Sequence, residues 1–209
     1  MPCAAWYKRG RMEVETEPDQ PLFGAIDVEA LFGDDSHRFF LKGMFFRSVA
    51  KSLGPKLDAV LEELEERPGP AGWLPFRDYS QRDYTVLSLA AARHRYPRLS
   101  DREAIRRLAR SDMEVFGDSM MGRVTLSLIG DTRRALTELP TIYQKIASGP
   151  WGFEAKAEGD RALRYTFRNH PGEWSYQVGQ CEGIAAHYGD RLCTRVVPDG
   201  RSVTMHLRW

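Results

Sequence analysis

At Trp151 the spacing of apolar residues changes from a helical period to an alternating one, and this change strongly limits the possible folds. Over residues 151–168, and again over 191–209, apolar side chains occupy alternate positions on both sides of a short turn. That pattern is typical of β-hairpins with one buried face. Before residue 140, apolar residues recur every three or four positions, as in amphipathic helices. Helices collected on one side of an antiparallel sheet make an α+β fold, which we predict for this chain.

The chain divides into a short arm and one domain. We predict an N-terminal arm with a short helix over residues 1–36 and a single α+β domain over 37–209. The expected order inside the domain is helices over 37–139, a hairpin over 151–168, a helix over 176–188 and a hairpin over 191–209. The first twenty residues are polar and acidic in their second half, which indicates an irregular segment. The stretch 118–129 is apolar on more than one side, so we expect a buried central helix there.

Composition excludes several classes of partner. Lys and Arg number 30 against 29 for Asp and Glu, so the net charge of +1 offers no overall field for nucleic acid. The three cysteines contain no CxxC pair, which favours free thiols in a reducing cytoplasm over a disulfide framework. No apolar run approaches the roughly 18 residues of a membrane span. We therefore expect a cytoplasmic protein that binds no nucleic acid and does not span a membrane.

Short motifs occur in order along the domain. They are KGMFF at Lys42, FRDY at Phe76, RDY at Arg82, MGRV at Met121, SYQVG at Ser175, EG at Glu182 and LRW at Leu207. Together they resemble the myxobacterial paralogous family of domains of unknown function, over about residues 38–209. That resemblance implies kinship and no particular activity.

The order of the elements is also similar to a wider ligand-binding fold. It is shared by haem nitric-oxide/oxygen sensors, four-vinyl-reductase domains and transport-particle subunits of the Golgi. This resemblance implies a cavity between helices and sheet that holds haem, a small hydrophobic molecule or an acyl chain. Fold alone does not establish function, so each residue must be weighed separately.

The helix over 176–188 supplies the first candidate ligand-binding residues. Gly179 and Gly183 lie four positions apart, so one face of the helix lacks side chains and lets a ligand or another backbone approach. The resemblance implies that this helix borders the ligand cavity. We therefore predict that Tyr176, Gly179 and Gly183 contact a ligand.

A Met-rich stretch supplies three further candidates. Phe116 and Met120 can line an adaptable apolar pocket, although packing in the core is the interpretation that we favour. Arg123 lies in the middle of the apolar stretch, and a buried guanidinium needs a partner. That partner is either an internal carboxylate or an anionic ligand.

Two groups of charged residues have alternative interpretations. Asp78, Tyr79, Arg82 and Asp83 form a polar cluster that is either a clamp for a ligand or partner, or a network of Arg–Asp pairs that stabilises the fold. Arginines at 102, 106 and 110 recur every four residues, which predicts a solvated basic face, with an acidic protein partner as the alternative.

Cofactor sites are poorly supported by the residues. His94 stands between two arginines, as at a solvated helix end, and Tyr165-Thr-Phe-Arg168 falls one residue short of the Tyr-x-Ser-x-Arg signature that the haem-sensor resemblance implies. Cys181, His187 and Cys193 lack the close ligand pair of a zinc site. No nucleophile or acid–base pair stands in a catalytic motif. We expect no cofactor and no catalytic residue.

Three functions remain open at this stage. The first is a non-enzymatic sensor or adaptor that binds a small apolar ligand or a protein partner in a crevice between helices and sheet. The second is a structural or protein-interaction subunit with no small-molecule ligand, and a homodimer through exposed hairpin edges is one form of it. The third is a haem-binding or metal-binding sensor.

Overall fold

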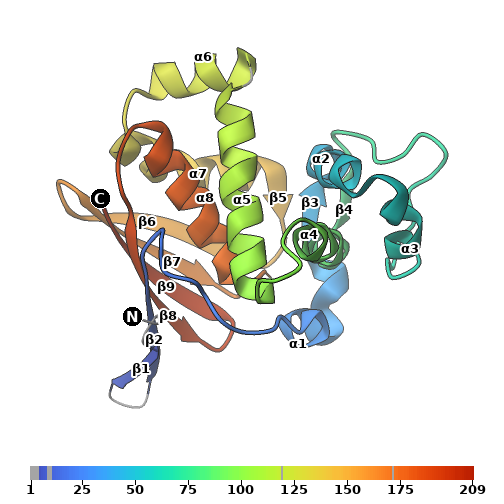
Figure 1. Ribbon diagram of the computed structural model, residues 1–209, viewed down its shortest axis with the longest axis horizontal. Coiled ribbons are helices and arrows are strands. Elements are labelled where there is room, and N and C mark those ends of the chain that lie inside the picture. The colour runs from blue at the N-terminus through green and yellow to red at the C-terminus, as the bar shows by residue number, and fades with distance from the viewer. Residues whose placement is uncertain (1–4, 9–10, 119, 171) are drawn as a thin grey trace.

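The computed structural model describes residues 5–8, 11–118, 120–170 and 172–209. The helices and strands follow one another along the chain (Figure 1). In order they are β1 (Ala5–Lys8), β2 (Arg11–Thr16), α1 (Val28–Phe32), β3 (Phe40–Lys42), α2 (Gly43–Leu53), α3 (Leu57–Leu61), β4 (Asp78–Ser80), α4 (Gln81–Arg95), α5 (Asp101–Asp118), α6 (Met120–Ile129), α7 (Thr132–Ile146), β5 (Ala147–Ser148), β6 (Gly152–Gly159), β7 (Ala162–Arg168), α8 (Trp174–His187), β8 (Cys193–Asp199) and β9 (Ser202–Arg208). Two 3-10 helices, Gly33–Arg38 and Gly54–Lys56, complete the described elements.

The main sheet confirms the predicted α+β class. Its strand order is β1-β2-β8-β9-β7-β6, with antiparallel neighbours, so the two expected hairpins are β6–β7 and β8–β9, with α8 between them in the chain. The alternating pattern places Tyr165, Phe167, Met205 and Leu207 on the face toward the helices, where each is at most 1% exposed. These side chains pack with Val178 of α8, so this part of the helix–sheet seam is filled.

The N-terminal arm differs from the irregular segment that its polar composition indicated. Strand β2 pairs with β8 over residues 14–16, placing Val14 opposite Val196, and both side chains are buried. The arm thereby covers backbone groups that β8 would otherwise leave as an open edge. A short polar strand of this kind is stabilised by the strand beside it, so its own sequence gives little indication that a strand forms.

Helices form successive layers above the sheet (Figure 1). α8 and α7 lie on the sheet, α5 packs along α8, and α4 joins α5 to a second core that contains α2 and α3. That second core also includes a small sheet of order β4-β3-β5, whose strands have only two or three residues and were not predicted.

Helix α6 contradicts the prediction of a buried central helix. Met120, Val124 and Leu128 are 80%, 58% and 77% exposed, and Arg123 is exposed as well, whereas Leu126 is buried. Figure 1 shows why: α6 crosses beyond the end of α5 and α8, where it has few neighbours. Apolar composition predicted burial, but the place of the helix in the fold does not supply a second packing surface.

His170 makes the stability of the fold depend on pH. The ring is 6% exposed, lies 4.8 Å from the ring of Phe167, and places Nδ1 2.8 Å from the carbonyl oxygen of Gly172. Burial lowers the pKa of His170 from 6.5 to about 4, so the folded state favours the neutral ring. The contribution of neutral His170 to the free energy of unfolding is therefore complete above pH 6.5. As the pH falls toward 4, this contribution of about 3 kcal/mol is lost.

We expect the free energy of unfolding of His170→Gln to lack this dependence. Urea unfolding between pH 7 and pH 4 gives the free energy of unfolding of the wild type and of His170→Gln. The difference between the two values cancels the contribution of the other titrating groups. Parallel curves over that range would show that the histidine is not buried in its neutral form.

Candidate functional site

A small pocket lies where α4, α7 and α8 meet, next to β3 and α2. Its volume is about 60 Å³. Aromatic and uncharged polar side chains dominate its wall. The lining includes Leu41, Phe45, Gln81, Tyr84, Thr85, Ser88, Ile105, Tyr143, Ile146, Glu173, Tyr176, Gln177 and Gln180. We call this hollow the tyrosine pocket, after Tyr84, Tyr143 and Tyr176.

The three tyrosines come from three different helices. The hydroxyl oxygens of Tyr84 on α4 and Tyr176 on α8 lie 2.9 Å apart, and their rings meet edge to face. Tyr143 on α7 donates its hydroxyl to Oε1 of Gln180 on α8. These bonds tie the three helices together around the pocket and fix the rings that form its wall.

Burial keeps the phenols of the pocket neutral. It raises the pKa of Tyr84 to about 12 and raises the pKa values of Tyr143 and Tyr176 above their usual range. A phenol with so high a pKa is neither a base nor an anionic metal ligand near neutral pH. The hydroxyls of the pocket are therefore hydrogen-bonding groups.

Gln177 carries an unpaired buried acceptor at the pocket. The side chain is 7% exposed, and its Oε1 makes no hydrogen bond within the described residues. Oε1 of Gln81, which also lines the pocket, is likewise buried and unpaired there. A buried amide oxygen without a partner is costly, so a donor from water or a ligand would stabilise it.

The acidic group at the pocket is already engaged. Glu173 caps α8, accepting from the backbone N–H of Ser175, and lies 3.2 Å from Nε of Arg102. Burial raises the pKa of this carboxyl, and Arg102 opposes the shift. The lining thus supplies neutral donors and acceptors, together with one internally paired carboxylate.

The structure separates the predicted ligand-binding residues. Tyr176 lies in the tyrosine pocket. Gly179 and Gly183 instead face α5: a Cβ at Gly179 would lie 2.0 Å from the carbonyl oxygen of Arg106, and one at Gly183 would lie 2.6 Å from Cβ of Met113. The close approach expected at these glycines is therefore that of a neighbouring helix.

The remaining three predicted residues lie away from the tyrosine pocket. Phe116 and Met120 are partly to largely exposed near the junction of α5 and α6, and they are absent from its lining. Arg123 is exposed on α6, so the prediction that it is buried and must be paired was wrong. The exposure of Met120 and Arg123 follows from the peripheral position of α6, and Phe116 lies near the end of α5, close to that helix.

The polar cluster makes its contacts within the fold. Asp83 is 2% exposed and accepts from the backbone N–H groups of Glu65 and Glu66, at 2.9 and 3.0 Å. Arg82 pairs with Glu29 at 2.5 Å and with Asp83 at 3.2 Å. The last two members have internal partners as well: Tyr79 accepts from the N–H of Leu74, and Asp78 pairs with Lys42.

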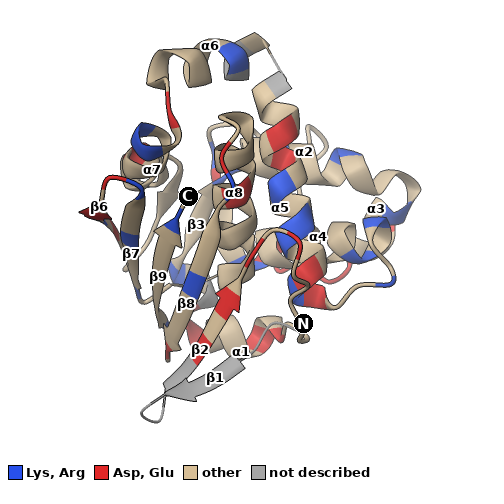
Figure 2. Ribbon diagram, turned by 60° about the vertical axis from the view of Figure 1, so that its left-hand side comes forward, with Lys and Arg blue, Asp and Glu red and all other residues tan. Residues whose placement is uncertain are grey.

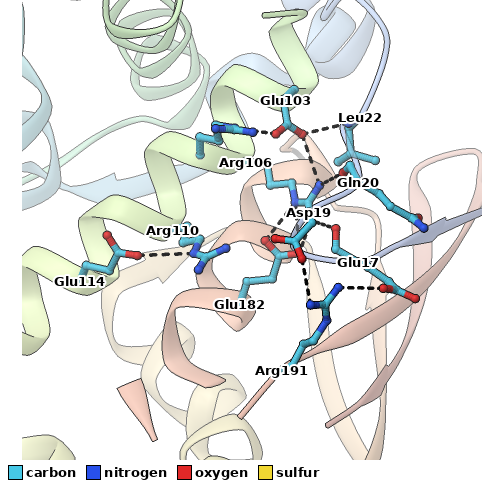
Figure 3. A network of polar contacts seen from close by, with 11 residues as sticks. Glu17, Asp19, Gln20, Leu22, Glu103, Arg106, Arg110, Glu114, Glu182 and Arg191 are labelled. Carbon is cyan, nitrogen blue, oxygen red and sulfur yellow. Dashed lines mark hydrogen bonds and ion pairs between the residues drawn. The ribbon is translucent and has the colours of Figure 1, made fainter. Parts of the chain in front are cut away.

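A buried ion pair is the main polar feature that the sequence did not predict (Figure 3). Arg106 on α5 is 1% exposed and binds both carboxylate oxygens of Glu182 on α8. It also donates to the carbonyl oxygens of Glu17 and Gln20 in the arm. The prediction of a solvated basic face was therefore wrong at Arg106, which lies beneath the arm.

Sequence reasoning also missed Tyr143, Gln177 and Gln180. The available indication was in α8, whose polar residues 177, 180 and 182 interrupt a helix that is apolar on most sides. A glutamine or glutamate inside such a helix needs partners from neighbouring elements. For Gln180 and Glu182 those partners come from α7 and α5, and their sequence positions do not reveal the contact.

The fold is shared with H-NOX proteins. An H-NOX mutant from T. tengcongensis matches with a TM-score of 0.60 and 14% identity, over 80% of this chain and 97% of that one. An H-NOX protein mutant from K. algicida matches with a TM-score of 0.58 and 13% identity, over 80% and 96%. A structure solved to probe haem distortion in the H-NOX family has a TM-score of 0.60 and 13% identity, over 81% and 95%.

Residues 37–209 match the family described as "Protein of unknown function (DUF2378)", and the chain belongs to that family. This range agrees with the span over which the sequence motifs are distributed. No curated protein matches the sequence.

Haem is named in the descriptions of the similar H-NOX structures, but it does not fit the tyrosine pocket. Its volume of about 60 Å³ is far below that of typical cofactor pockets, roughly 300–1,000 Å³. Histidine, cysteine and methionine, the usual axial ligands besides tyrosinate, are absent from its described lining, and its tyrosines are neutral. Arginine and lysine, which would hold propionates, are absent from that lining too.

The described residues contain neither a cluster of metal ligands nor a membrane-spanning helix. No three His, Cys, Asp or Glu side chains gather there in a way that would hold a metal ion. Cys181 is buried and Cys193 is exposed, and Cys3 lies outside the described residues. None of the described helices has the length and apolar character to cross a bilayer.

Proposed function

We propose that this protein is a non-enzymatic sensor or adaptor domain whose tyrosine pocket binds a small, uncharged, largely apolar ligand. The observation that carries the proposal is the unpaired Oε1 of Gln177 beside a pocket lined by aromatic rings and neutral hydroxyls. Ligand pockets commonly combine an apolar wall with a few convergent polar groups, as this one does.

The lining specifies the chemistry of the ligand. The pocket offers no free charge, because its phenols are neutral and Glu173 is paired with Arg102. Gln177 and Gln81 each present an acceptor without a partner among the described residues. A ligand with a hydroxyl or N–H donor on a short apolar body would satisfy one of these oxygens.

The volume limits how much of the ligand is enclosed. A cavity of about 150 Å³ accepts benzene, so about 60 Å³ encloses only a few heavy atoms. A short aliphatic alcohol meets both conditions. The H-NOX neighbours support the general role of a sensor, whereas the pocket of this chain supports a ligand other than haem.

Binding of 1-butanol against its isomer diethyl ether tests the proposal. Both have the same atoms, but only the alcohol donates a hydrogen bond. Titrations followed by NMR shifts of α4 and α8 amides should saturate, with affinity about 2- to 10-fold higher for butanol, the usual value of one neutral hydrogen bond. Gln177→Leu should remove this preference.

Gln144→Leu on the exposed face of α7 is the matched control, and it should keep the preference for butanol. The proposal would be contradicted by NMR shifts that do not saturate. It would also be contradicted if the Gln177→Leu variant kept the wild-type preference for butanol over diethyl ether. Haemin added to the same samples should give no saturable Soret shift.

A second candidate function is protein interaction through α6. The exposed side chains of Met120, Val124 and Leu128 recur every four residues and form an apolar stripe. If the chain self-associates through this stripe, light scattering should show a dimer that Leu128→Glu converts to a monomer. A wild-type monomer at high concentration would rule out this homodimer.

A further inference from the structure

A second, larger hollow lies between the N-terminal arm and helices α4 and α5. Its volume is about 430 Å³, within the range of roughly 300–1,000 Å³ that organic ligands occupy. Its walls include Pro18 of the arm, Tyr96 after α4 and four arginines. Arg106 is the buried partner of Glu182, and the other three, Arg95, Arg107 and Arg110, lie at the rim. We call it the arginine groove. Figure 2 shows basic and acidic residues along this part of α5.

The inner carboxylates of the groove are already neutralised (Figure 3). Glu182 receives a bidentate contact from Arg106. Glu103, which is 2% exposed, accepts from Arg106, from Nε of Arg107 and from the backbone N–H of Leu22. The floor of the groove therefore repels an anion much less than its count of acidic residues indicates.

The three arginines at the rim retain unused donors. Arg107 contacts Glu103 through Nε at 2.7 Å, and Arg110 reaches Glu114 through Nε at 3.4 Å. Arg95 lies over the ring of Tyr96, with Cζ 5.5 Å from its centre. It makes no direct salt bridge with another described residue, although its charge lowers the pKa of the nearby Asp112 carboxyl against the effect of burial. In the described parts of the chain, the terminal nitrogens of these three side chains make no hydrogen bond, so each guanidinium can still bind an oxyanion.

The arm also forms part of the groove wall. The carbonyl oxygens of Glu17 and Gln20 accept from Arg106, which fixes the chain on both sides of Pro18 and Asp19. Asp19 pairs with Arg191 at 2.8 Å, so its charge is also compensated. The buried ion pair thus holds the wall in place, and the rim arginines remain available.

We propose that the arginine groove binds an organic phosphate. Guanidinium groups match the oxygens of a phosphate in geometry and charge, and three of them border one hollow. The ring of Tyr96 and the ring of Pro18 provide surface for the organic part of the ligand. The site is separate from the tyrosine pocket, so the two proposals stand or fall independently.

Calorimetric titration with phenyl phosphate at low salt tests the groove. We expect one saturable site, weakened about tenfold or more in Arg95→Gln and in Arg107→Gln. Inorganic phosphate should bind several-fold more weakly than phenyl phosphate, because it lacks the group that contacts Tyr96. Urea unfolding of each variant verifies that the fold persists.

Arg98→Gln is the charge-matched control. Arg98 is exposed, lies three residues after Arg95 and does not line the groove, so this variant should bind like the wild type. If Arg98→Gln weakened the binding of phenyl phosphate as much as Arg95→Gln does, the ligand would be attracted by positive charge in general and not by the groove. That result would overturn the proposal. A wild-type titration that does not saturate would also overturn the proposal. Unchanged affinity in the Arg95→Gln variant would do the same, because this substitution breaks no direct salt bridge within the described parts of the fold.

Discussion

Replacing Arg106 with methionine should lower the free energy of unfolding by about 3–5 kcal/mol, the usual cost of removing one partner of a buried ion pair. Glu182 is 3% exposed and would lose the bidentate partner that compensates its buried charge. The carbonyl oxygens of Glu17 and Gln20 would lose their donor as well, which loosens the arm. Urea unfolding measures the loss.

The pH dependence of this variant provides a second measurement. Burial raises the pKa of Glu182, and Arg106 opposes that shift in the wild type. Without Arg106 the folded-state pKa rises further above the unfolded value. Stability from the protonated carboxyl is then present at low pH and lost as the pH rises, so the variant should be more destabilised at pH 8 than at pH 5.

Two controls separate this effect from a simple loss of charge. Arg107→Met removes a half-exposed guanidinium from the same helix and should cost about 1 kcal/mol or less. The double variant with Arg106→Met and Glu182→Leu removes both charges and should recover a substantial part of the loss. If Arg107→Met costs as much as Arg106→Met, the buried pair is not what stabilises this region.

Sequence patterns identified the elements whose burial follows from their own period. The hairpins over 151–168 and 191–209 alternate strictly, and both form with the expected face inward. The structure of two other segments depends on neighbouring elements, which their own sequence patterns do not indicate. The polar strand β2 forms because β8 lies beside it, and the apolar helix α6 stays exposed because nothing covers it.

The candidate site shows the same limit. Tyr176 was assigned to a pocket from the resemblance, and it lies in one. Tyr143 and Gln177 were missed because the pocket is made by three helices whose contact no local pattern encodes. The regular helical spacing of the arginines predicts that Arg106 is solvated, because such residues normally lie on an exposed helix face. Only the arm, folded over α5, makes it a buried partner of Glu182.

The similarity to H-NOX structures is a similarity of fold alone. About four-fifths of this chain follows that fold at 12–14% identity. In the tyrosine pocket, however, aromatic rings and hydrogen-bonded glutamines leave about 60 Å³, and the described lining has no histidine. At this identity the shared backbone does not specify the internal chemistry, so the ligand is inferred from the side chains of this chain.

Replacing Gly179 with alanine should destabilise the fold by about 3 kcal/mol or more, the upper end of the cost of overpacking a core. The added Cβ would lie 2.0 Å from the carbonyl oxygen of Arg106 and 2.8 Å from its carbon. These are backbone atoms, so no side-chain rotation relieves the contact and α5 must move away from α8. Because that movement also separates Arg106 from Glu182, the loss should exceed that of an ordinary methyl insertion.

Gly69→Ala is the matched control for Gly179→Ala. A Cβ at Gly69 meets no atom within 4 Å, so its stability should stay within about 0.5 kcal/mol of the wild type. Urea unfolding compares the two variants directly. A Gly179→Ala protein as stable as the control would mean that α5 and α8 do not approach each other this closely. The buried pair and the wall of the arginine groove both depend on that approach, so each would then need a different explanation.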